Sequence, residues 1–306
     1  MGDNLKILEK IPSIISVRRV SLTNKIKEHL GPIRSKQAIK NSKKLYVYKI
    51  YYKSKGNKIA GYIVEPRIGK NLPCIIWNRG GARDYACIKI RNLLCDRSSI
   101  TVLANNGYLV IATQYPGVDG GTGIDNKGGD EDLASILDLY KILENYKRAD
   151  EKRVGMEGFS RGGSMTYMCL RKVKWIKAAV IAGANSDKVN THKYRESEIE
   201  RRKKFFKNTL AEKKKRSAIY WVNELPKKTP ILLMHGTSDW RVNPLDSIKM
   251  SEKLFENKIP HRLIMYEGAD HQLTEYRKEY LNNTLQWFDR FVKNNETLPD
   301  MKLHGR

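Results

Sequence analysis

The chain has 306 residues, 40% of them hydrophobic, which is enough to bury the core of one large α/β domain or of two smaller ones. It carries 58 Lys and Arg against 33 Asp and Glu, a formal net charge of +25, and its four cysteines show neither a CxxC motif nor a paired spacing. Because the N-terminal stretch "MGDNLKILEKIPSIISVRR" also lacks a sustained apolar run, we expect a cytoplasmic protein without a disulfide framework, a secretory signal or a membrane-spanning helix.

The N-terminal part is expected to differ from the rest of the chain. Residues 1–44 have the pattern of a helical, basic extension, and the main domain is expected to cover 45–306. It begins with "LYVYKIYYK" and "NKIAGYIVEP", two alternating runs around the turn-prone "SKGN", which predict a hairpin. The chain contains no internal repeat and no low-complexity linker.

From residue 73 onward, short β-rich runs alternate with helical stretches. One such helix is "DEDLASILDLYKILENY", in which Asp130 can cap the first turn. This alternation predicts an α/β fold with a mostly parallel central sheet and helices on both faces. Reactive side chains in such folds lie beyond the carboxyl ends of the strands. The predicted strands are "PCIIWN", "YLVIATQY", "RVGMEGF", "IKAAVIAG", "PILLMHG" and "RLIMYEG".

A candidate nucleophile follows the third of these strands. In "VGMEGFSRGGSMTYMCL", Ser160 stands in a GxSxG motif between a predicted strand and a predicted helix, the setting of a nucleophile elbow. Gly158 and Gly162 would allow the sharp turn and the close packing of helix and strand. At the helix N-terminus, the backbone N–H of Arg161 could hold a developing oxyanion.

Chain order and position select the partners of this serine. His271, in "YEGADHQL", is the one of six histidines that follows the last predicted strand on a loop. His235 closes "ILLMH" and is expected to pack or hydrogen-bond locally. Asp239, just after the preceding strand, is the first candidate for the acid and Asp187 the second, whereas Asp270 is expected to be structural.

Two segments could suggest other ligands. Arg201–Arg216 holds nine Lys or Arg against one acid, but no nucleic-acid motif accompanies it, so we interpret it as a solvated helix and expect no nucleic-acid partner. The loop "YPGVDGGTGIDNKGGDED" fits neither a P-loop nor an EF-hand spacing, so no metal and no cofactor are expected. Residues from about 185 to 228 are expected to form a long, lid-like helical insertion before the acid-bearing strand.

From about Tyr46 to Lys293, the chain resembles the catalytic domain of the prolyl oligopeptidase family of serine peptidases, within the α/β-hydrolase superfamily. The resemblance implies Ser160 as nucleophile, Asp239 as acid and His271 as base, which agrees with the choice made from order and position. Four stretches in the family's order carry it: "PCIIWNRGGARDY", "LANNGYLVIATQYPG", "GFSRGGSMTY" and "SAIYWVNELPKKTPILLMHGTSDWRVNPLDS", with "YEGADHQL" downstream.

The sequence departs from the family pattern in two places. Full-length relatives often carry a β-propeller ahead of the hydrolase, where this sequence has only a short predicted helical extension and a hairpin, so we expect the filter that restricts access to small peptides to be missing. Relatives present a tyrosine, or a histidine followed by glycines, where this chain reads "WNRGG". The oxyanion hole is therefore expected to use the backbone N–H of Gly80 or Gly81 with that of Arg161. Arg79 is either an oxyanion ligand, a substrate anchor or a salt-bridged support, and Arg79 and Tyr115 are the candidate substrate-binding residues.

The predicted function is hydrolysis of peptide or amide bonds through an acyl-enzyme on Ser160, with a small peptide-like or ester substrate. Two alternatives stay open. The same triad would serve a carboxylesterase, and the basic run would suit a binding module that does not use its hydrolase fold. The sequence carries no signal for an oligomeric state or for a membrane partner.

Overall fold

A computed structural model describes residues 4–126, 128–191, 194, 207 and 209–302. The chain divides into two compact units, Met1–Val154 and Gly155–Arg306, with the boundary inside one strand, β6 (Ala149–Phe159). Residues 1–44, predicted to form a separate extension, belong to the first unit.

The first unit is built on an antiparallel sheet that continues into a parallel pair. The strand order is β1-β2-β3-β5-β4, followed by β6. The pairs β1–β2, β2–β3 and β3–β5 are antiparallel, and the pair β5–β4 is parallel. In chain order its elements are α1 (Asn4–Glu9), β1 (Ile14–Arg19), α2 (Asn24–Ser42), β2 (Leu45–Ser54), β3 (Asn57–Pro66), β4 (Leu72–Asn78), η1 (Ile90–Asn92), α3 (Ser99–Asn105), β5 (Leu109–Thr113) and α4 (Asp130–Asn145).

The predicted hairpin is β2 and β3. Their register ends at the pair Ser54 and Asn57, so the turn consists of Lys55 and Gly56, with φ of 44° and 78°. Two positive φ values in a two-residue turn match the right-handed twist of the strands. The N-terminal extension predicted to be helical contains α1 and α2, but it also contains a strand that was not predicted, because Ile14–Arg19 pair as β1 with β2.

The predicted helix of residues 130–146 is α4, but its first turn is capped differently. The N-cap is Gly129, and the buried Asp132 carboxylate accepts hydrogen bonds from the backbone N–H groups of Gly128 (2.6 Å) and Gly129 (3.2 Å). Asp130 is already the first helical residue. A carboxylate at this third helical position accepts from the backbone N–H of the N-cap residue, whereas an N-cap side chain would accept from N–H groups inside the first turn.

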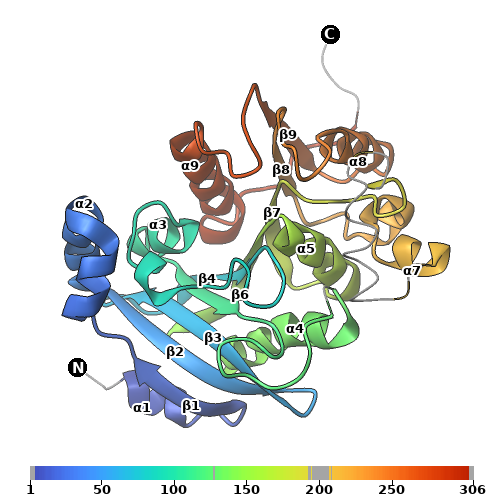
Figure 1. The fold of residues 1–306 in the computed structure, drawn as a ribbon. Coiled ribbons are helices and arrows are strands. Elements are labelled where there is room, and N and C mark those ends of the chain that lie inside the picture. Colours follow the sequence, from blue (N-terminus) through green and yellow to red (C-terminus); the bar gives the residue numbers. More distant parts are fainter. Residues whose placement is uncertain (1–3, 127, 192–193, 195–206, 208, 303–306) are drawn as a thin grey trace. The chain divides into compact units, whose positions relative to one another are not determined.

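The second unit is a parallel α/β layer. The strand order is β6-β7-β8-β9, and the pairs β7–β8 and β8–β9 are parallel. All six residues of β8 are buried, as expected for a strand covered on both faces. In Figure 1, α9 lies on one side of these strands and α5 and α8 lie on the other. The elements are α5 (Arg161–Lys172), β7 (Ile176–Ala182), α7 (Leu210–Lys215), η3 (Ala218–Tyr220), η4 (Val222–Glu224), β8 (Ile231–Gly236), α8 (Leu245–Glu256), β9 (His261–Tyr266), α9 (Arg277–Phe288) and η5 (Asp289–Lys293). The predicted α/β class is therefore confirmed.

The four cysteines are free thiols. Cys74, Cys95 and Cys169 are buried, and Cys87 is half-buried. Within the described parts of the chain, no helix combines the length and the apolar character needed to cross a bilayer.

Candidate active site

Ser160 occupies a sharp turn between β6 and α5. Its backbone has φ 56° and ψ −120°, a strained combination for a residue with a side chain. The strain is held from both sides: its N–H donates to the carbonyl of Ala182 (2.8 Å), and its carbonyl accepts from Gly163 (3.0 Å) and Ser164 (3.2 Å). The predicted strand-turn-helix setting of the GxSxG motif is present.

Glycines make this turn possible. A Cβ on Gly158 would lie 2.2 Å from the carbonyl oxygen of Gly162 and 2.4 Å from Thr166 Oγ1. A Cβ on Gly163 would lie 2.9 Å from Cγ2 of Ile181 in β7 and 2.6 Å from the Ala184 Cβ just after it, so this strand also approaches the helix closely. The predicted role of Gly158 in close packing fits these distances. Gly162 supplies the backbone against which Gly158 packs.

The three residues expected to form a triad are joined by hydrogen bonds within the second unit. His271 Nε2 is 3.0 Å from Ser160 Oγ, and His271 Nδ1 is 2.6 Å from Asp239 Oδ2. The His271 ring lies on the turn after β9 and packs against Phe159, with ring centroids 5.1 Å apart. His271 is 6% exposed and Asp239 is fully buried, whereas Ser160 is half-exposed. This leaves the nucleophile as the accessible end of the chain of hydrogen bonds.

The Asp239 carboxylate is surrounded by donors. Oδ1 accepts from the backbone N–H groups of Arg241 (2.8 Å) and Val242 (2.9 Å), in the turn that follows β8. Oδ2 accepts from two imidazoles, those of His235 and His271. Burial alone would raise the pKa of Asp239, but the hydrogen bonds from His235 and His271 outweigh it and hold the pKa well below its usual range. Asp239 is therefore a carboxylate at neutral pH.

Two groups around Asp239 were not foreseen in these roles. His235 was expected to hydrogen-bond locally, and its partner is Asp239 itself, at 3.0 Å. The hydroxyl of Tyr194 donates to the backbone carbonyl of Asp239. The short spacing of His235 and Asp239 in "HGTSD", across the turn at the end of β8, is the one signal in the sequence that points to their contact.

The other two acids considered for the triad have local partners. Asp187 accepts hydrogen bonds from the backbone N–H groups of Val189 and Asn190 and from the Asn190 side chain. Asp270 accepts from the backbone N–H groups of Gln272 and Thr274. Both carboxylates therefore close turns, the role expected for Asp270.

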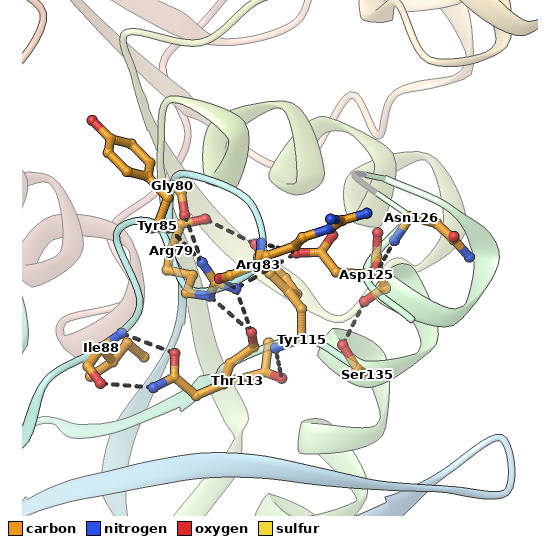
Figure 2. A network of polar contacts seen from close by, with 12 residues as sticks. Arg79, Gly80, Arg83, Tyr85, Ile88, Thr113, Tyr115, Asp125, Asn126 and Ser135 are labelled. Carbon is orange, nitrogen blue, oxygen red and sulfur yellow. Dashed lines mark hydrogen bonds and ion pairs between the residues drawn. The ribbon is translucent and has the colours of Figure 1, made fainter. Parts of the chain in front are cut away.

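In the first unit, Arg79 is the centre of a polar network, drawn in Figure 2. Its side chain is 0% exposed, and its guanidinium donates five hydrogen bonds of 2.7–3.2 Å to the carbonyls of Gln114, Gly80, Tyr85 and Arg83. Asp125 Oδ2 lies 3.7 Å from Nη2. These contacts fit the third alternative for Arg79, a salt-bridged support.

Tyr115 belongs to the same network. It is 0% exposed, its hydroxyl donates to the backbone carbonyl of Arg79 (3.0 Å), and the Arg79 guanidinium lies over its ring at 4.9 Å. The burial of Arg79 and Tyr115 argues against the predicted substrate-binding role of both residues. Their contacts fix the loop that contains Gly80 and Gly81.

Gly81 lies in a tight turn of that loop. Its φ is +67°, and a Cβ there would lie 2.2 Å from the Tyr85 carbonyl oxygen, so only glycine fits. The predicted oxyanion donors Gly80 and Gly81 thus belong to the first unit, and Arg161, the first residue of α5, belongs to the second. Their joint role stays a prediction.

The long connection between β7 and β8 is described in part. Residues 195–206 and 208, which include much of the basic run, lie outside the described residues. The described part contains α7, whose Thr209 N-cap accepts from the Glu212 N–H and whose Lys214 and Lys215 are exposed, together with η3 and η4. A lid-like position of this connection stays a prediction. Among the described residues, no group of three or more His, Cys, Asp or Glu is arranged to hold a metal.

The chain is similar in sequence to known serine peptidases. The profile of the prolyl oligopeptidase family matches residues 95–295. An uncharacterized peptidase of Bacillus subtilis strain 168, YtmA, is 25% identical over 252 residues, which cover 80% of this chain and 94% of that protein. Dipeptidyl-peptidase 5 of Porphyromonas gingivalis is 22% identical over 259 residues, 78% of this chain but 36% of that protein.

Solved structures share the fold at lower identity. The acylaminoacyl peptidase of Pyrococcus horikoshii superposes with a TM-score of 0.71 at 20% identity, over 84% of this chain and 43% of that one. An acylaminoacyl peptidase in complex with Z-Gly-Gly-Phe-chloromethyl ketone gives a TM-score of 0.70 at 18% identity, over 98% of this chain and 45% of that one. The chain thus spans nearly all of the Bacillus relative but less than half of these longer peptidases.

Proposed function

The chain belongs to the prolyl oligopeptidase family of serine peptidases, and from that premise we propose that it cleaves peptide or amide bonds through an acyl-enzyme on Ser160. The observation that carries the proposal is the continuous chain of hydrogen bonds from Ser160 through His271 to a buried, ionised Asp239. Such a chain is what a serine hydroxyl requires to become a nucleophile.

In the first half of the reaction, His271 Nε2 accepts the proton of Ser160 Oγ as the oxygen attacks the scissile carbonyl. Nδ1–H stays hydrogen-bonded to Asp239, which keeps the imidazole in the required tautomer and stabilises the imidazolium. His271 then donates its proton to the leaving amine. In the second half, water attacks the acyl-enzyme with His271 again as base, and Ser160 is restored.

The tetrahedral intermediate carries an oxyanion that needs donors. We assign this role to the backbone N–H of Arg161, at the positive end of the α5 dipole; a second donor from Gly80 or Gly81 stays the expectation from the sequence. The buried Arg79 network supports the second donor by fixing its loop.

The substrate class follows from the family. Peptides are the substrates of this family of peptidases, and a peptide chloromethyl ketone is bound to an acylaminoacyl peptidase of the same fold. We propose a small peptide or peptide-like substrate, and a cytoplasmic location in accord with the free thiols. An ester substrate on the same triad is the competing outcome of the test below.

The test is labelling with a fluorophosphonate probe, followed by turnover of matched peptide and ester panels. Wild-type protein is expected to be labelled at Ser160, and Ser160→Ala is expected to abolish both labelling and turnover. Faster cleavage of esters than of all peptides would assign an esterase. If the folded wild-type protein is not labelled, the remaining interpretation is a basic binding module that does not use its hydrolase fold.

The acid is tested with a matched pair of variants. Asp239→Asn places an amide where two histidines or two backbone N–H groups donate, so we expect kcat to fall about 10⁴-fold with the fold retained. Asp187→Asn is the control, because the Asp187 carboxylate accepts hydrogen bonds from Val189 and Asn190 and none from the triad residues. Loss of activity in Asp187→Asn with full activity in Asp239→Asn would transfer the acid role to Asp187.

A further inference from the structure

A second histidine is bonded to the acid of the triad. His235 Nε2 lies 3.0 Å from Asp239 Oδ2, the same oxygen that His271 Nδ1 approaches to 2.6 Å. His235 is the fifth residue of β8 and is 0% exposed. The base and this second imidazole therefore share one carboxylate oxygen.

The other nitrogen of His235 has a partner that fixes its tautomer. Nδ1 lies 2.6 Å from Ser247 Oγ, in the first turn of α8. If the serine hydroxyl donates to Nδ1, the imidazole is neutral and must carry its proton on Nε2, which then donates to Asp239. The carbonyl of Val242, 3.3 Å from Nε2, is a second acceptor for the same proton. Both acceptors near Nε2 therefore favour a proton there.

The charged groups around His235 are consistent with a neutral ring. Asp239 also accepts hydrogen bonds from the backbone N–H groups of Arg241 and Val242 and from His271. Asp246, next to Ser247 on α8, is a further acid that interacts with His235. Burial and the charge of Asp187 raise the pKa of Asp246 to about 7, although the charges of His235 and Lys188 act in the opposite direction. Asp246 is bonded to Asn185 Nδ2 at 2.7 Å instead. A full imidazolium at a 0% exposed site would add a desolvation cost that the neutral tautomer avoids.

We propose that His235 is a positioning residue: as the neutral Nε2–H tautomer set by Ser247, it fixes the Asp239 carboxylate and limits the negative charge that Asp239 presents to His271. The proposal rests on the proposed peptidase function. Two donors on Oδ2 and two on Oδ1 leave the carboxylate a single orientation. The shared oxygen couples the two imidazoles, because each hydrogen bond to Oδ2 draws charge from the other.

Three variants separate the parts of this arrangement. His235→Leu removes the donor, His235→Gln keeps an N–H at about the same reach, and Ser247→Ala removes the group that selects the tautomer. Ser251→Ala is the matched control, because Ser251 is a serine of the same helix whose hydroxyl bonds to another histidine, His261 (2.9 Å), away from the acid. Circular dichroism and thermal melting check the fold of each variant.

The kinetic expectation is a loss in kcat rather than in KM. His235→Leu is expected to lower kcat by the roughly 10- to 100-fold that loss of an orienting hydrogen-bond partner typically causes, with KM little changed. The acid limb of its pH profile of kcat/KM is expected to move to higher pH, since Asp239 then presents more negative charge to His271. His235→Gln should recover most of kcat, Ser247→Ala should lie between them, and Ser251→Ala should match the wild type.

A measurement without substrate separates this proposal from the proposed function. In ¹⁵N-histidine-labelled protein at neutral pH, His235 is expected to show a protonated Nε2 and an unprotonated Nδ1, and Ser247→Ala is expected to disturb that pattern. A doubly protonated His235, an Nδ1–H tautomer, or a folded His235→Leu variant with wild-type kcat and pH profile would overturn the proposal. Failure of wild-type protein to react with the fluorophosphonate would instead overturn the proposed function and leave the ¹⁵N result standing.

Discussion

Arg79 illustrates how a charged residue can be used entirely inside a protein. Its guanidinium is fully buried and donates to backbone carbonyls on two segments, the loop of Gly80, Arg83 and Tyr85 and the residue Gln114 after β5. It thus satisfies carbonyl groups that no secondary structure pairs there. Asp125 is close enough to balance its charge. Such a site tolerates neither the loss of the donors nor a different donor geometry.

We expect Arg79→Met to reduce the stability of the protein by about 3–5 kcal/mol, because carbonyls and Asp125 lose a buried charged partner. Arg79→Lys should recover only part of this, since one ammonium cannot reach all the acceptors. Urea denaturation measures the effect, and kcat of the remaining folded protein should stay near the wild-type value. A pure loss of kcat at unchanged stability would place the guanidinium in the oxyanion hole.

Glu65 is a buried acid with a different consequence. It accepts from Asn4 Nδ2 (3.1 Å) and from the Tyr146 hydroxyl (2.9 Å), and Arg148 lies at 3.4 Å. Burial raises the pKa of Glu65 to about 7, although Arg148, Tyr146 and Asn4 act in the opposite direction. The folded state therefore binds a proton more tightly than the unfolded state does.

The sign of the pH effect follows from that difference. The stability associated with protonated Glu65 is fully present below the ordinary pKa of 4.5 and is lost as the pH rises through about 7, a total of about 3 kcal/mol. Glu65→Gln has no such loss, so its Tm relative to wild type should rise between pH 5 and pH 8. The control is Glu144→Gln, at an exposed position of α4. A Tm difference independent of pH would contradict the prediction, since the similar contribution of Asp246 is common to both proteins.

At the scale of elements, the turn between β6 and α5 concentrates the strain of the site. Gly158→Ala would push a methyl group to within 2.2 Å of the Gly162 carbonyl oxygen, which is backbone and cannot rotate away. We expect this variant to move the first turn of α5 and to lower fluorophosphonate labelling of Ser160 at least tenfold. Gly107→Ala is a comparison that strains the backbone, at φ +91°, but meets no atom within 4 Å of the added carbon. Normal labelling of Gly158→Ala would show that the turn can adjust.

How far the sequence leads depends on the range of the contacts involved. The hairpin of β2 and β3 and the elbow at Ser160 follow from neighbours along the chain, and both were predicted. Strand β1 was missed because "IISVRR" is only six residues long, does not alternate, and becomes a strand by pairing with β2. The partners of Arg79 could not be predicted, because they are backbone carbonyl groups, which every residue has, so the sequence does not distinguish them. His235 was noted as a local hydrogen-bonding residue, but its contact with Asp239 depends on the shape of the turn after β8, which the sequence alone does not give.

At the scale of the whole molecule, the dominant property is the net charge of +25. Part of it lies on α7, where Lys214 and Lys215 are exposed and Lys213 is half-buried. Such charges act on an anionic substrate over distances of about 10 Å at 0.1 M salt. We expect kcat/KM for an anionic peptide to fall as salt rises, and the joint replacement of these three lysines by Gln to flatten the dependence. If kcat/KM for a neutral peptide depends on salt in the same way, the lysines of α7 do not contribute to binding of the anionic substrate.

The buried cysteines allow each unit to be followed separately. Cys74 lies in β4 of the first unit and Cys169 in α5 of the second; both are 0% exposed, and burial raises the pKa of both thiols. Because only a thiolate reacts, a disulfide reagent should modify Cys87 at once and reach the other thiols only when the surrounding structure opens. The native chain thus contains one natural thiol probe in each unit. The rates at which Cys74 and Cys169 react, measured separately by peptide mass spectrometry, would compare how often the two units open, without any engineered label.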